Sequence, residues 1–123
     1  MMLKIDRIDS NKGASRIVKY NGIAYFTGHS ARPGFKTLKE QTAAVLARYD
    51  ELFAQHGLKK ENIIVMNAYL ADIKMIDEFN EVYEAWIDGV YAPAGVAVEA
   101  KPMGENNLLE LQFNVAYDES EEA

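Results

Sequence analysis

The arrangement of apolar and polar residues along the chain predicts six strands and two helices. The clearest pattern lies at 108–115, where apolar residues alternate with Glu110, Gln112 and Asn114. Because successive side chains of a strand point to opposite faces, this alternation predicts a strand with one apolar and one polar face. Glu110 therefore shares its face with two amides, and that row lies either against water or in a functional site.

The N-terminal part of the chain carries the signals of three strands. Apolar residues between positions 3 and 8 (Leu3, Ile5 and Ile8) indicate a short first strand. Residues 15–28 are predicted to form two strands joined at Asn21-Gly22, because this pair supplies the positive φ angles of a type I′ turn. The segment 31–34, Ala-Arg-Pro-Gly, is predicted to be a loop, since Pro and Gly interrupt both helix and ladder.

Two helices follow from the 3.6-residue period of the apolar positions. Thr37 and Glu40 form a capping box at the start of the first helix, and Gly57 offers its C-cap. The second helix begins near Ile76, and Gly89 is placed to end it. Both helices present one apolar face, which predicts that each packs on a sheet.

Strands are also predicted at 63–70 and 95–100. The first is apolar at nearly every position, as expected for a central strand covered on both faces. The resulting order, β-β-β-α-β-α-β-β, predicts an α+β fold with one mixed sheet and both helices on one of its faces. The other face, which includes the Glu110 row, is left bare, and such faces are usually buried by self-association.

Composition narrows the functional classes. The 123 residues fit one domain at 1–117 followed by an acidic tail at 118–123, and the tail supplies four charges of the net −6. Without a Lys/Arg stripe we expect no nucleic-acid partner. With no cysteine, and with His29 and His56 lacking a ligand spacing, we expect no metal. No apolar run approaches the roughly 20 residues of a membrane span, which predicts a cytoplasmic protein without membrane contact.

Several motifs in fixed order resemble those of the RidA/YjgF family, also described as endoribonuclease L-PSP or translation inhibitors. They cover roughly residues 13–117. In chain order they are Asn-Gly-Ile-Ala-Tyr-Phe-Thr-Gly at 21–28, Glu40-Gln41-Thr42, Asp72, Phe-Asn-Glu-Val-Tyr at 79–83, Pro93-Ala94 and Glu110. The resemblance implies a chorismate-mutase-like fold and a homotrimer that binds small molecules at its three subunit interfaces, and it implies no cofactor.

The resemblance also implies a chemistry and a set of site residues. Active members hydrolyse an enamine or imine to a 2-oxo acid and ammonia, and a glutamate on the last strand positions the attacking water. The matching residue here is Glu110, and His29 is a candidate second proton carrier because it follows the strand end. The ligand-binding positions that the resemblance implies are Thr27, Gly28, Gly95 and Ala97.

The chain departs from the family pattern at the substrate clamp. Gly95 stands where the family has an arginine that binds the substrate carboxylate, and Ala14 is the nearest match to a missing tyrosine. A guanidinium–carboxylate contact is worth on the order of 1.5 to 3 kcal/mol, so its loss predicts weak activity on ordinary 2-imino acids. The segment 80–93 is also shorter than in the commonest family form, as in the divergent subgroups that often lack the arginine. Arg32 and Lys101 are candidates for a replacement charge.

Three interpretations of function stay open at this point. The first is hydrolysis of an imine or enamine-type substrate with Glu110 as general base or water positioner. The second is a trimer that binds a small molecule without catalysis, which the loss of the clamp at Gly95 favours. The third is a ribonuclease or translation inhibitor, and it rests only on the family's older label.

Overall fold

The computed structural model describes residues 2–122, so Met1 and Ala123, at the ends of the predicted domain and tail, lie outside it. Six strands form one sheet in the order β1-β2-β3-β6-β4-β5, with β4 and β5 parallel and the other pairs antiparallel. The strands are β1 (Asp6–Ser10), β2 (Ser15–Tyr20), β3 (Ile23–Phe26), β4 (Ile63–Leu70), β5 (Ala94–Glu99) and β6 (Leu109–Ala116). The predicted α+β class and element order are confirmed.

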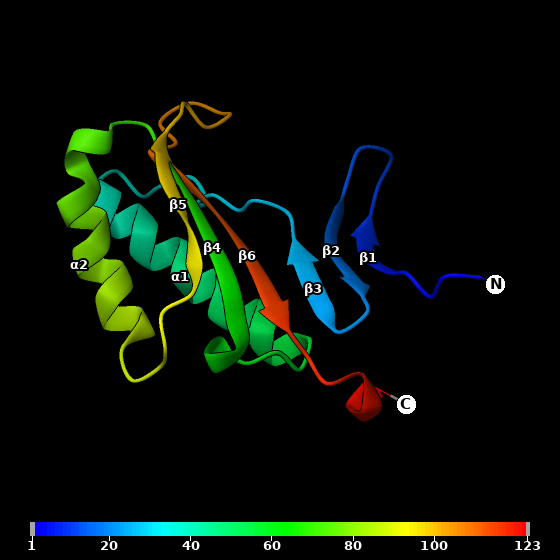
Figure 1. Cartoon of the computed structure of the whole chain (residues 1–123). Coiled ribbons are helices and arrows are strands. Elements are labelled where there is room, and N and C mark those ends of the chain that lie inside the picture. The colour runs from blue at the N-terminus through cyan, green and yellow to red at the C-terminus, as the bar shows by residue number, and fades with distance from the viewer. Residues whose placement is uncertain (1, 123) are drawn as a thin grey trace.

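Helices α1 (Leu38–Gln55) and α2 (Ile76–Ile87) lie side by side on one face of the sheet (Figure 1). The capping box is present, since the Glu40 amide donates to Thr37 Oγ1 at 3.1 Å and the Thr37 amide donates to Glu40 Oε1 at 3.2 Å. Three short 3-10 helices lie at Lys60–Asn62, Ile73–Met75 and Glu119–Glu122. None of the helices within 2–122 is long and apolar enough to cross a membrane.

The hairpin between β2 and β3 has the predicted turn, because Asn21 and Gly22 both have positive φ angles, 53° and 84°. The first strand lies further along the chain than the apolar residues suggested. It begins at Asp6, where pairing with β2 begins, and continues to Ser10 opposite Ser15. Leu3 precedes the strand and is 63% exposed, so its apolar character did not mark a buried strand position.

The core lies between the helices and the sheet. Phe113 of β6 is fully buried there, and its ring meets the ring of Tyr49 from α1 edge-on with centroids 4.5 Å apart. The strand β6 alternates between buried and half-buried positions along its whole length, as its sequence predicted. The expectation that β4 is covered on both faces is not met within one chain, because Asn67 and Tyr69 are only half-buried on the side without helices.

The sheet face without helices is called the open face here. Strand register assigns Glu110, Gln112 and Asn114 of β6 to it. Large apolar side chains surround this polar row and are 38% to 55% exposed: Tyr20, Tyr25, Val96 and Val98. A contiguous exposed apolar surface around a polar centre is typical of an interaction or ligand-binding site.

Candidate functional site

Glu110 lies on the open face near the end of the sheet from which the β3–α1 and β5–β6 connections leave. It is paired with Tyr69 of β4, which is in turn paired with Val98 of β5, so the three side chains share the face. The Glu110 carboxylate lies directly against Gly28. A Cβ atom on Gly28 would be 2.5 Å from Glu110 Oε2, so only glycine leaves room for the carboxylate in this position.

A β-bulge brings Gly28 under Glu110. Tyr25 of β3 is paired with Asn114, whereas His29 is paired with Leu111. Between these two pairs the chain advances four residues after β3 but only three along β6, so one residue before His29 is extra. The pairing resumes at His29, whose amide donates to the Leu111 carbonyl at 2.8 Å and whose carbonyl accepts from the Leu111 amide at 2.9 Å. Bulges of this kind redirect side chains and often lie beside functional sites.

Tyr49 holds the bulged segment and β6 together from the helix side of the sheet. Its hydroxyl donates to the Leu111 carbonyl at 2.8 Å and lies 3.3 Å from the Thr27 carbonyl. His29 Nδ1 lies 3.0 Å from the Thr27 carbonyl and 3.2 Å from the Tyr49 hydroxyl oxygen. The carbonyl contact assigns the proton to Nδ1 of the neutral ring. This network therefore fixes the backbone at Leu111, which follows Glu110, and at Thr27, which precedes Gly28.

Burial keeps the two side chains of this network uncharged. It raises the pKa of Tyr49 far above its ordinary value, and the nearby charge of Glu110 raises it further. Burial also lowers the pKa of His29, against the opposing effect of the hydrogen bond to the Thr27 carbonyl; the charges of Arg16 and Arg48 lower it too. At neutral pH both groups act as hydrogen-bonding groups rather than as ions.

The structure separates some residues that the sequence grouped. His29 lies on the helix side of the sheet with Leu111, whereas Glu110 lies on the open face. Within one chain the His29 ring is thus directed toward Tyr49, and a role for it as proton carrier with Glu110 stays a prediction. Thr27 and Gly28 do adjoin Glu110, through the bulge.

Gly95 and Ala97 also lie away from Glu110 within one chain. Their partners on β4 are Met66 and Ala68, so both β5 residues belong to the face that carries the helices. Gly95 has a φ of +144°, and a Cβ atom there would overlap the Met66 carbonyl. The position therefore accepts only glycine in this backbone conformation, and the missing arginine leaves no vacant space behind it. Within one chain Gly95 and Ala97 therefore form no common site with Glu110.

Gln41 joins the two connections at this end of the sheet, a role that the sequence analysis did not assign. Its side chain is 2% exposed, and its amide nitrogen donates to the carbonyls of Phe35 at 2.9 Å and Asn106 at 2.8 Å. Its amide oxygen accepts from the Leu108 amide, also at 2.9 Å. A glutamine on the core side of an amphipathic helix was the signal for this role, because a buried amide needs partners.

The two candidates for a replacement charge lie in the connections. Arg32 of the β3–α1 connection lines a cavity against α1, and Lys101 follows β5 and lines the surface beside Ala71 and Met103. Neither forms an ion pair with Glu110 among the described residues. Among residues 2–122, which the structure describes, no group of three or more His, Asp or Glu side chains is arranged to hold a metal ion.

Comparison with known proteins gives a consistent result across the whole domain. A family model described as "Endoribonuclease L-PSP" matches residues 4–117. A RutC family protein of Haemophilus ducreyi is 32% identical over 112 residues, which cover 91% of this chain and 96% of that protein. A RutC family protein of Haemophilus influenzae is 34% identical over 100 residues, covering 80% and 86%. The crystal structure of NMB1025, a YjgF family member from Neisseria meningitidis, superposes with a TM-score of 0.87 at 28% identity and covers 94% of this chain and 97% of that one.

Proposed function

This chain belongs to the RidA/YjgF family, whose model is described as Endoribonuclease L-PSP, and from that premise we propose that it hydrolyses a small imine or enamine at the interfaces of a homotrimer. The open face is the surface buried between copies. Glu110 positions the water that attacks the carbon of the C=N bond. The products are a carbonyl compound and ammonia.

The observation that carries the proposal is the placement of Glu110. The carboxylate lies over Gly28 on the face that carries the exposed apolar side chains, and a second copy seated on that face would enclose it. In the proposed reaction Glu110 accepts a proton from water as the oxygen bonds to the imine carbon. The nitrogen then leaves as ammonia after it has gained protons, so one water is consumed for each C=N bond broken. General acid–base catalysis of this kind contributes about 10²- to 10⁴-fold to a rate.

The backbone at Gly95 favours a substrate that lacks a carboxylate. Gly95 occupies the position at which other family members have the arginine that binds the substrate carboxylate. Gly95 has no side chain, and its close approach to the Met66 carbonyl leaves no room for one. Without the arginine, a substrate carboxylate has no charged side chain to bind at this position. We therefore expect imines that lack the carboxylate to be better substrates than 2-imino acids.

An assay on imines generated in situ tests this proposal. An amino acid oxidase supplies 2-imino acids and an amine oxidase supplies imines without the carboxylate, and ammonia release in excess of the spontaneous rate is measured. Glu110→Gln should lower the enzymatic rate by about 100-fold or more. The matched control is Glu61→Gln, an exposed glutamate in a 3-10 helix near the start of β4, which should retain the wild-type rate. Equal rates for Glu110→Gln and wild type would contradict the proposed role.

The absence of a side chain at Gly95 also favours a second function, which is binding without catalysis. Because Gly95 replaces the arginine that binds the substrate carboxylate, we propose as an alternative that the trimer binds an uncharged small molecule and does not convert it. A ligand that binds only the native state raises the melting temperature by mass action. An imine or carbonyl compound that raises the melting temperature of wild type and of Glu110→Gln equally, with no ammonia release by either protein, would favour this alternative.

A further inference from the structure

A small cavity lies on the helix side of the molecule, between α1 and the connection from β3. Its volume is about 210 Å³. The apolar part of its lining comes from the ring of Phe35 and from Ala44 and Ala47 of α1. The cavity is distinct from the Glu110 site, because α1 and the open face lie on opposite sides of the sheet (Figure 1).

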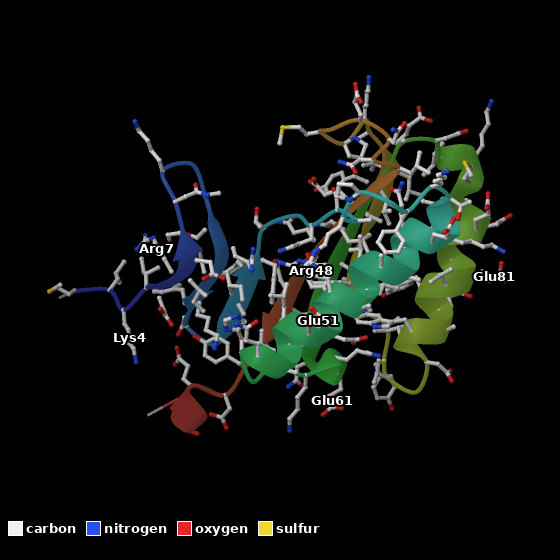
Figure 2. The ribbon with its side chains drawn as sticks, turned by 180° about the vertical axis from the view of Figure 1, so that it is seen from behind. Lys4, Arg7, Arg48, Glu51, Glu61 and Glu81 are labelled. Atoms are coloured by element: carbon white, nitrogen blue, oxygen red, sulfur yellow. The ribbon has the colours of Figure 1, made fainter. Side chains whose placement is uncertain are left out.

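Two guanidinium groups border this cavity. Arg32 comes from the connection and Arg48 from α1, and Figure 2 shows Arg48 at the edge of α1 beside the connection, with Glu51 nearby on the same helix. Neither arginine forms an ion pair or a hydrogen bond among the described residues. By contrast Lys39, on the same helix, forms an ion pair with Glu81 at 2.7 Å.

Glu51 is the one acidic residue in the lining, so the lining carries a net charge of +1 in a protein whose net charge is −6. Arg48 and Glu51 are three residues apart on α1, a spacing at which side chains of a helix are neighbours. Even so, their charged atoms are not within the 4.0 Å of an ion pair. The guanidinium of Arg48 is therefore available to an anion from solution.

We propose that this cavity binds a small organic carboxylate, with Arg32 and Arg48 at the carboxylate and Phe35, Ala44 and Ala47 around its apolar body. Guanidinium groups bind carboxylates through paired hydrogen bonds, and aromatic rings stack on guanidinium and ligand planes alike. A volume of about 210 Å³ accommodates a single aromatic ring with its acid group. The cavity is smaller than a drug-sized site, so the ligand is of metabolite size.

Benzoate is the probe, and benzamide, which has the same shape without the charge, is its control. Chemical shifts of the ¹⁵N-labelled protein are followed during the titration. Benzoate should shift the amides of residues 30–35, apart from Pro33, and of residues 44–51, and benzamide should not. Arg48→Gln should weaken benzoate binding by about tenfold, as expected for the loss of one partly exposed charge-assisted contact.

Two further variants decide between a specific site and a general effect of charge. Glu51→Gln should tighten benzoate binding, because it removes the one negative charge of the lining. Arg7→Gln makes the same charge change as Arg48→Gln but on β1, far from the cavity (Figure 2), and should leave the affinity unchanged. The proposal is overturned if benzoate causes no localised shifts, if benzamide binds equally well, or if Arg48→Gln and Arg7→Gln have the same effect. None of these results depends on the activity assigned to Glu110.

Discussion

The two faces of the sheet differ in what holds their residues in place. On the helix side, Phe113, Leu111 and Tyr49 are fully buried, and the Tyr49 hydroxyl has hydrogen-bond partners within the chain. On the open face, Glu110 and Asn114 are half-buried among exposed apolar side chains. Both faces are built by the same strand, β6, whose residues alternate between them. One side of β6 thus belongs to the core of a single chain. The other side belongs to a surface that a single chain leaves uncovered.

This difference shows how the fold positions the Glu110 carboxylate, the proposed water-positioning group, without burying it in the core of one chain. The helix side fixes the backbone through Tyr49 and Gln41, and the open face then presents Glu110 from a rigid strand. Substitutions on the helix side should therefore change the free energy of unfolding. Substitutions on the open face should instead change assembly and activity.

Neighbouring residues of β6 give the sharpest test of this difference. Phe113→Ala should lower the free energy of unfolding by about 3 to 5 kcal/mol, because it leaves a cavity among packed rings. Asn114→Ala, one position further on, should cost less, about 1 kcal/mol, and its cost should depend on protein concentration, because the open face is proposed to be buried between copies. Urea unfolding followed by circular dichroism measures both values. Comparable losses for the two variants at every protein concentration would show that both faces are core within one chain.

The Gln41 side chain offers a test of the polar part of the helix side. Gln41→Ala should lower the free energy of unfolding by about 2 to 4 kcal/mol, because it leaves buried backbone groups of the β3–α1 and β5–β6 connections without partners. Gln55→Ala removes the same side chain from an exposed position of α1 and should have little effect. An unchanged urea midpoint for Gln41→Ala would show that water satisfies those backbone groups.

The smallest expected effect concerns pH. Because burial lowers the pKa of His29 below its ordinary 6.5 in the folded state, the unfolded chain binds more protons as the pH falls through this value. Stability should therefore be complete above pH 6.5 and decrease below it until the pH reaches the folded-state pKa, by no more than about 1.4 kcal/mol per pH unit. His29→Asn should flatten the profile between about pH 5.5 and 7.5. A wild-type profile that rises on acidification would contradict the assigned neutral ring.

Local sequence signals predicted much of the architecture. The alternation around Glu110, the Asn21-Gly22 turn and the Thr37 capping box are each fixed by residues close together in the chain, and each is present in the structure. The start of β1 was less predictable. It depends on pairing with β2 rather than on the apolar residues at its N-terminal side.

The site was harder to predict because its geometry comes from contacts between distant segments. The bulge before His29 exists only in the pairing of β3 with β6, and it decides which face the ring occupies. The conformation of Gly95 likewise depends on Met66 of the neighbouring strand. The sequence marked Glu110 and Gly28 individually, but the contact between them required the fold.

Light scattering of the purified protein tests the central claim most directly, because the Glu110 site is proposed to be completed by further copies. The account predicts a particle with three times the chain mass of 13.8 kDa, and dissociation when Val98→Asp places a charge on the open face. A wild-type particle of 13.8 kDa at working concentration would contradict it.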